Sequence, residues 1–279
     1  MRGREPLIIW LLFGLVTVEI LVTYSRVPAA ELYHVSGTGL AGGASRALVF
    51  LNFSTALVAL ALIALAYTQL PGRALRALAV VAALLCTPVF WPGVVSQADL
   101  DARWVNVPAA VGVALALGLT ATNRPRVSAR RGDRVRIALG LLVLLAAPAW
   151  LAADLGFFLN GVPVLGSIYE TGPHFVHHGH HHGMDGVLLV LAALLLSRAL
   201  PAIRAHALRL VTAAYLALML SYGVGNVAND FWLEQVVKRG WTGWAIPSVL
   251  EPGLTSAWAV LLAGAAAVWL LWFKDLRET

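Results

Sequence analysis

Eight long apolar stretches constrain this chain more than any other feature of its sequence. A helix that crosses a bilayer needs about 20 mostly apolar residues. We expect such helices at about 6–25, 46–69, 74–95, 107–122, 136–159, 178–200, 209–229 and 254–273. The composition agrees, because 59% of the residues are hydrophobic and 12% are charged, whereas soluble domains carry about 25% charged residues. The sequence therefore predicts an all-α, polytopic integral membrane helical bundle of about eight transmembrane helices, forming a single domain over 1–279.

The basic residues predict the orientation of this bundle, because Lys and Arg concentrate in the cytoplasmic connections of membrane proteins. With a cytoplasmic N-terminus, the connections on that side hold fifteen of the 20 basic residues, namely Arg2, Arg4, Arg73, Arg76, Arg124, Arg126, Arg130, Arg131, Arg134, Arg136, Arg198, Arg204, Arg209, Lys274 and Arg277. The other side holds Arg26, Arg46, Arg103, Lys238 and Arg239. We therefore expect both termini in the cytoplasm and the protein in the cell (plasma) membrane. The net charge of +6 follows from this bias and indicates no nucleic-acid partner.

A histidine-rich stretch, HFVHHGHHHGMDG at 174–186, precedes the sixth apolar stretch. Six of the chain's eight histidines lie within its first nine residues. We expect one helix from about 172 to 200 through this region. Thr171 suits the N-cap, Pro173 suits the first turn, and no helix breaker follows until Pro201.

The spacing within this helix predicts a metal site. At about 100° per residue, most of the imidazoles and one carboxylate fall on one side of the helix. Residues four apart place two ligands on the same side of a metal ion. The expected ligands are His174, His177, His178, His181, His182 and Asp185. The opposite side carries Gly179, Gly183 and Gly186, small residues that let membrane helices approach closely. The alternative is a solvent-exposed histidine collar that binds metal loosely.

Three acidic residues on other predicted helices lie toward the same side of the membrane. Glu19 is in the outer half of the first span, and Asp154 is at the outer end of the fifth. Asp230 shares a face of the seventh helix with Tyr222, Asn226 and Asn229. A carboxylate within a span needs a partner, which a metal ion or a protonated histidine would supply. We expect Glu19, Asp154 and Asp230 to act as catalytic residues: further ligands, hydrogen-bonding partners of ligands, or a general base.

The expected cytoplasmic halves of the spans contain no ionisable group apart from tyrosine hydroxyls. Transporters need a polar path in both directions, so this asymmetry favours a site that opens outward only. The single cysteine, Cys86, excludes a multi-thiolate site. Imidazole and carboxylate ligands favour copper or zinc as the cofactor, and iron is also compatible.

Two functions are compatible with such a site. The first is a metal-dependent enzyme, an oxidoreductase or hydrolase, acting on a lipid or another hydrophobic small molecule that reaches the metal from the bilayer. The second is an extracytoplasmic metal-capture or metal-delivery protein, or an accessory subunit of a larger membrane complex. The expected partners are the lipid bilayer and a hydrophobic small molecule or metal ion. The sequence leaves open whether another membrane protein or a second copy of the chain completes the site.

Two outer segments carry weaker patterns. The run GTGLAGG at 37–43 fits GxGxxG but follows no predicted strand, which excludes a dinucleotide site. We expect a tight loop there, leading to a helix that begins near Ser45. The segment 231–244, rich in tryptophan, is expected to form a short helix in the membrane interface.

Overall fold

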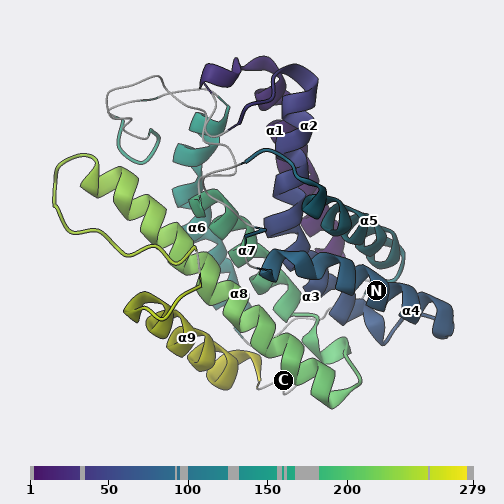
Figure 1. The fold of residues 1–279 in the computed structure, drawn as a ribbon. Coiled ribbons are helices and arrows are strands. Elements are labelled where there is room, and N and C mark those ends of the chain that lie inside the picture. Colours follow the sequence, from purple (N-terminus) through teal and green to yellow (C-terminus); the bar gives the residue numbers. More distant parts are fainter. Residues whose placement is uncertain are drawn as a thin grey trace.

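The computed structural model describes residues 3–31, 35–91, 93–94, 100–124, 132–155, 159, 162–166, 182–250 and 252–274, without the side chains of Glu31, Ala153 and Asp154. Every regular element in these ranges is helical (Figure 1). The α-helices are α1 (Glu5–Arg26), α2 (Gly39–Phe50), α3 (Ala56–Tyr67), α4 (Gly72–Cys86), α5 (Val107–Thr122), α6 (Asp133–Asp154), α7 (His182–Ser197), α8 (His206–Trp232) and α9 (Ser256–Val268). Three π-helical turns continue them: η2 (Leu51–Thr55) joins α2 to α3, η6 (Leu233–Val237) extends α8, and η7 (Trp269–Phe273) extends α9. Short 3₁₀ turns lie at η1 (Ala29–Glu31), η3 (Thr87–Phe90), η4 (Trp104–Asn106) and η5 (Leu200–Ala202).

Seven of the helices in the described ranges are long and apolar enough to cross a membrane. They correspond to seven of the eight predicted spans, and the remaining one is α7, which is apolar but only 16 residues long in the described part of the chain. The predicted class, an all-α membrane bundle of about eight helices, is therefore confirmed. The predicted start of the sixth helix near residue 172 lies outside the described residues.

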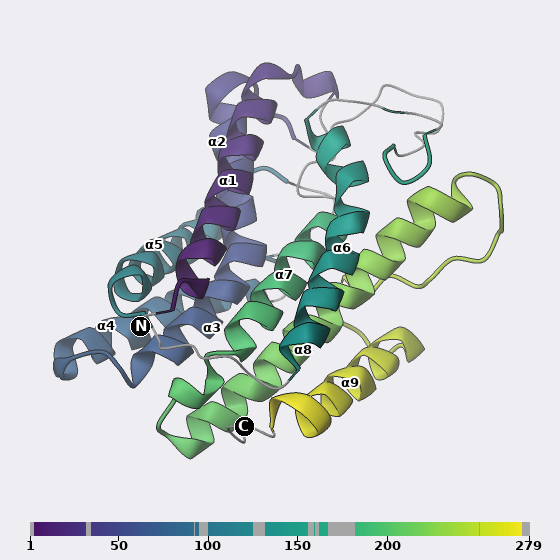
Figure 2. The same cartoon turned by 180° about the vertical axis from the view of Figure 1, so that it is seen from behind.

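The short helix α7 occupies the centre of the bundle. Thirteen of its sixteen residues are buried, and it packs against α6 on one side and α8 on another (Figures 1 and 2). A helix that is apolar around its whole circumference suits a position in a protein core or in lipid, and the sequence of α7 from Val187 to Leu196 is uniformly apolar. Other helices of the bundle lie around α7. The helices α4 and α5 pack against α3 on the side away from α9 (Figure 2).

Glycines bring α7 and α8 into backbone contact. A Cβ atom built on Gly186 would lie 2.6 Å from the Gly223 carbonyl oxygen, and one on Gly223 would lie 2.8 Å from the Gly186 carbonyl oxygen. A Cβ atom on Gly183 would overlap the Trp150 ring of α6. Gly183 and Gly186, two of the three glycines on the predicted small-residue side, therefore face helices of the same chain.

One end of the bundle, which we call the basic end, is joined by ion pairs. Arg198 at the end of α7 binds Glu5 of α1 (Nη1 to Oε1, 2.7 Å) and Asp133 of α6 (Nη2 to Oδ2, 3.3 Å). The guanidinium of Arg136 lies 4.8 Å from the centre of the Trp272 ring, next to the end of α9. The beginning of α1 and the end of α9 therefore meet at the same end, as expected of a chain whose termini share one side of a membrane. The other end, where α7 begins at His182, is called the histidine end.

Two boundaries differ from the sequence-based expectations. Residues 39–43 form the first turns of α2 instead of a loop, because Gly43 lets α2 approach α1 so closely that a Cβ atom there would overlap the Leu21 carbonyl oxygen. Residues 231–237 continue α8 through η6 and do not form a separate interfacial helix. Both expectations were wrong because tertiary packing extends a helix beyond the apolar stretch that predicts it.

We predict that Gly186→Ala destabilises the bundle by about 1–3 kcal/mol, since the added methyl group must push apart two backbones that cannot otherwise adjust. The free energy of unfolding, measured by titration with a denaturing detergent, checks this. The matched control is Gly14→Ala on α1, where a Cβ atom meets nothing within 4 Å. Equal unfolding free energies for the two variants would contradict the close contact between α7 and α8.

Candidate functional site

Asp185 lies buried in the first turn of α7 and is held by the α2–α3 segment. It is 3% exposed, and its Oδ1 accepts a hydrogen bond of 2.5 Å from the Ser54 hydroxyl. Ser54 belongs to the π-helical turn η2. Single π-turns within α-helices are frequent at functional sites, and this one aims a hydroxyl at a carboxylate inside the bundle.

Asp230 on α8 binds the beginning of α7. The Gly183 amide donates a hydrogen bond of 2.6 Å to Asp230 Oδ2. The first amides of a helix have no partner within it, and a carboxylate at this position also interacts favourably with the helix dipole. Asp230 therefore acts as an N-terminal cap of α7 that comes from another helix, which fixes the end of α7 next to α8.

Glu234 forms the third buried carboxylate at the histidine end. It is 5% exposed and lies on η6, one turn beyond Asp230. Its Oε2 accepts a hydrogen bond of 3.0 Å from the Trp150 indole of α6. The helical segment of α8 and η6 is thus joined at this end to α6 by the Trp150–Glu234 bond and to α7 by the Gly183–Asp230 bond.

The remaining polar residues of the α8 face have structural contacts. The Tyr222 hydroxyl donates to the Leu250 carbonyl oxygen at 3.0 Å, and the Asn229 amide donates to the Ile246 carbonyl oxygen at 2.5 Å. Asn226 donates to the carbonyl oxygen of Tyr222 at 2.9 Å. The first two bonds hold the segment between α8 and α9 against α8. Of the four predicted polar residues, Asp230 is the one whose described hydrogen bond reaches α7.

Glu19 of α1 lies at the level of Arg46 of α2. From the sequence, Arg46 is expected on the outer side of the membrane. Arg46 on α2 is 2% exposed. Along the α1–α2 pair, Gly43 lies against Leu21 and Phe50 stacks on Phe13, which places Arg46 beside the turn of α1 that contains Glu19. Arg46 therefore lies inside the α1–α2 pair, at the level of Glu19, and not in an outer connection.

Only part of the predicted site falls within the described residues. His174, His177, His178 and His181 lie outside them, as does the side chain of Asp154 at the last residue of α6. His182 is in the first turn of α7, three residues before Asp185. In the described part of the chain, no group of three or more His, Cys, Asp or Glu side chains is arranged to hold a metal ion. The described residues alone therefore do not form a metal centre, and the metal-site prediction depends on the histidines at 174–181.

Sequence reasoning missed Ser54, Trp150, Glu234 and Arg46. Glu234 could have been found from its spacing. It lies four residues after Asp230, so a prediction that extended the seventh helix to residue 234 would have placed both carboxylates on one face. Ser54 and Trp150 gave no such indication, since a serine or tryptophan within an apolar stretch is unremarkable until its partner is known. The chain matches no protein-family model, no curated protein and no solved structure.

We predict that Asp230→Ala destabilises the protein by about 1–3 kcal/mol, because the buried Gly183 amide loses its acceptor. Asp230→Asn keeps an acceptor oxygen at nearly the same place and should cost clearly less. Unfolding free energies of the two variants in the same detergent check the difference. If Asp230→Asn is as destabilising as Asp230→Ala, the negative charge matters more than the hydrogen bond, and the role of Asp230 as a cap is insufficient.

Proposed function

We propose that this chain is a membrane metalloprotein whose metal site lies at the histidine end, where the histidine-rich segment enters α7. His174, His177, His178, His181, His182 and Asp185 supply the ligands. The observation that carries the proposal is the burial of Asp185 and Asp230 around the first turn of α7. His182, the last histidine of the run, lies in that turn three residues before Asp185, so the end of the histidine run reaches a region with buried carboxylates.

The donor types suit the proposed metal. Imidazole nitrogen and carboxylate oxygen are ligands of zinc, copper and iron, and copper or zinc is the preferred choice. Such an ion, when bound, polarises a substrate or activates water or oxygen. Asp230 positions α7, and with it the ligands His182 and Asp185. Asp154 and Glu19 provide further candidate ligands, or a general base that removes a proton from the substrate or from water.

An enzyme is favoured over simple metal capture because the buried carboxylates come from two helices and are each held by a third segment or by each other's helix. Loose capture requires only redundant ligands on one segment, whereas catalysis requires groups held in fixed positions. Asp185, Asp230 and Glu234 are each fixed by a hydrogen bond from another helix. The substrate is a lipid or another hydrophobic small molecule that reaches the site from the bilayer. The site faces outward from the cell membrane.

The metal should be measurable in the purified protein. We predict a stoichiometric transition metal after dialysis against a mild chelator, and its loss in His178→Ala/His181→Ala, because two ligands on one side of the ion are removed. Elemental mass spectrometry of the detergent-purified protein checks this. The matched control is His206→Ala, which removes an exposed histidine at the start of α8 and should retain the metal.

The outcomes separate the candidate functions. Metal that is retained in full by the double variant would refute the proposed ligand set. Partial loss in every single-histidine variant would indicate redundant capture, and complete loss in one of them would indicate a fixed centre. Retention of metal in Asp154→Asn together with loss of substrate turnover would support a catalytic role for Asp154.

The outward orientation predicts a labelling pattern. In a variant in which Cys86 is replaced by alanine, a cysteine at Gly243, between α8 and α9, should react with a membrane-impermeant thiol reagent added to intact cells. A cysteine at Ala205, just before α8 at the basic end, should react only after lysis. Both native residues are exposed, so access depends on the side of the membrane. The reverse pattern would place the histidine end in the cytoplasm.

A further inference from the structure

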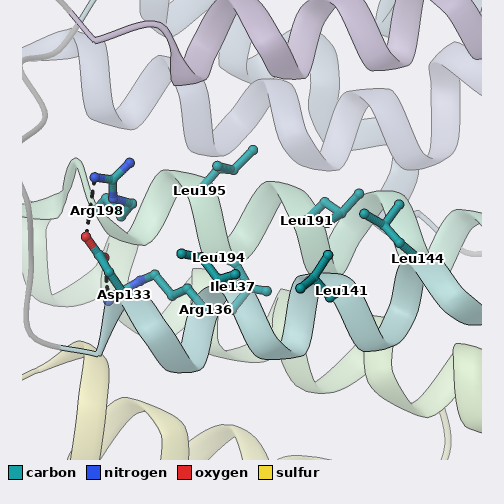
Figure 3. Close-up of a pocket in the computed structure, with 10 residues that line it drawn as sticks. Asp133, Arg136, Ile137, Leu141, Leu144, Leu191, Leu194, Leu195 and Arg198 are labelled. Atoms are coloured by element: carbon teal, nitrogen blue, oxygen red, sulfur yellow. Dashed lines mark hydrogen bonds and ion pairs between the residues drawn. The ribbon is translucent and has the colours of Figure 1, made fainter.

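The chain at the two ends of α6 is held against its neighbours by different kinds of contact. At the basic end, Figure 3 shows the Asp133 carboxylate between the guanidinium groups of Arg136 and Arg198, with leucine side chains of α6 and α7 farther along the helices. Ion pairs and apolar contacts act together there. At the histidine end, residues 162–166, which we call the strap, are attached to η6 by hydrogen bonds from two side chains.

Gln235 and Arg239 hold the strap through its backbone. The Val164 amide donates to Gln235 Oε1 at 2.9 Å, and Gln235 Nε2 donates to the Gly166 carbonyl oxygen at 3.0 Å. Arg239 Nη2 donates to the Val162 and Gly166 carbonyl oxygens, at 3.1 and 2.8 Å. It also lies 3.0 Å from Gln235 Oε1. Because these bonds share atoms, the loss of one side chain would weaken the bonds that the other makes.

The side chains of the strap contribute little to its attachment. Val162, Val164 and Leu165 are 41%, 43% and 46% exposed, so only part of their apolar surface is buried. Gln235, by contrast, is 5% exposed, and both polar atoms of its side chain are bonded to the strap. The position of the strap therefore depends mainly on the hydrogen bonds of Gln235 and Arg239.

These hydrogen bonds hold Val164 in an unfavourable backbone conformation. Its φ is +67°, in the left-handed region, and no other residue except glycine has a positive φ in the described ranges. A β-branched residue in this region is a genuine outlier, and such strain persists only where the surrounding contacts impose it. The closed strap therefore stores conformational free energy, which is released when the strap opens.

The strap lies beside a buried carboxylate. Gln235 directly follows Glu234 on η6, and both residues are 5% exposed. Glu234 itself is bonded to Trp150 of α6 and not to the strap in the contacts described above. Opening of the strap would uncover Gln235 and admit solvent to the turn of η6 that carries Glu234.

We propose that the strap is a latch at the histidine end. Gln235 and Arg239 hold it closed against the strain at Val164. It opens as one unit when their bonds break, and the open form admits water and small solutes to the Glu234 carboxylate. A segment with few buried apolar contacts opens at a low free energy, as a reversible cover requires. This inference does not depend on the proposed metal site, because the contacts that carry it involve no histidine.

Residue-resolved hydrogen exchange of the full-length protein in detergent tests the latch. Gln235→Leu removes both polar atoms that bind the strap. We expect exchange of the Val164 and Gly166 amides to accelerate together by about tenfold or more, since several hydrogen bonds are lost at once. The matched control is Gln69→Leu, at a glutamine that binds the Leu65 carbonyl oxygen of α3, and it should leave both amides unchanged. Acceleration at Val164 alone would overturn the proposal.

A second variant acts in the opposite direction and tests the strain. Val164→Gly keeps the backbone hydrogen bonds, and glycine adopts a positive φ readily, so exchange of the Gly166 amide should become slower. Val162→Gly is the control, because Val162 is similarly exposed but has no positive φ, and it should not slow this exchange. Exchange that is equally fast in Val164→Gly and the wild type would contradict a strained latch.

Chemical labelling tests what the latch covers. A water-soluble carbodiimide with an added amine converts accessible carboxyl groups to amides, and mass spectrometry locates the product. Amidation of Glu234 should be faster in Gln235→Leu and slower in Val164→Gly than in the wild type, whereas Asp101, in another outer connection, should react equally in all three. Equal rates at Glu234 would overturn the proposal. If Gln235→Leu fails to fold, Val164→Gly decides alone, because it is expected to stabilise the closed strap.

Discussion

The contact between the backbones of α7 and α8 is the constraint on which the rest of the structure depends. Gly186 and Gly223 bring the two helices so close that neither position has room for a side chain. Lipid tails are as apolar as leucine, so helices in a bilayer associate through close packing and interhelical hydrogen bonds. The remaining faces of α7 are then covered by α6 and by the α1–α3 helices. The positions of Asp185 and Asp230 follow from this contact, since each lies within two turns of it along its own helix.

The hydrogen bond from the Gly183 amide to Asp230 satisfies a backbone donor that lipid could not satisfy. Lipid offers no acceptor for the first amides of a helix, so each must be satisfied by protein. The Gly183 amide, in the first turn of the described part of α7, has its acceptor on the neighbouring helix α8, in the carboxylate of Asp230. The longer helix α8 reaches past the beginning of α7 and so can cap it.

The fold was predictable from the sequence because it depends on long apolar stretches, and eight such stretches correspond to helices. The site was predictable only in part. Asp185 and Asp230 could be identified because a carboxylate within an apolar helix is unusual. The partners that orient them, Ser54 and the Gly183 amide, could not, since they are defined by packing between helices distant in sequence. Arg46 was assigned to the outer side because it is the first residue of the predicted span 46–69, yet α2 begins seven residues earlier, at Gly39. The π-turns η2 and η6 change which residues share a helical face. A sequence prediction that assumes a fixed repeat of 3.6 residues does not reproduce this change.

The described partners of the acidic residues differ between the two ends of the bundle. At the basic end, Arg198 and Arg136 are paired with Glu5 and Asp133, so charges of opposite sign hold the helices together. At the histidine end, Asp185, Asp230 and Glu234 each accept a hydrogen bond from a neutral donor of another helical segment: a hydroxyl, an amide and an indole. If a cation binds beside these groups in the folded state only, its binding free energy adds to the stability of the bundle. The α7–α8 contact and the proposed metal site would then stabilise each other, because the same turn of α7 takes part in both.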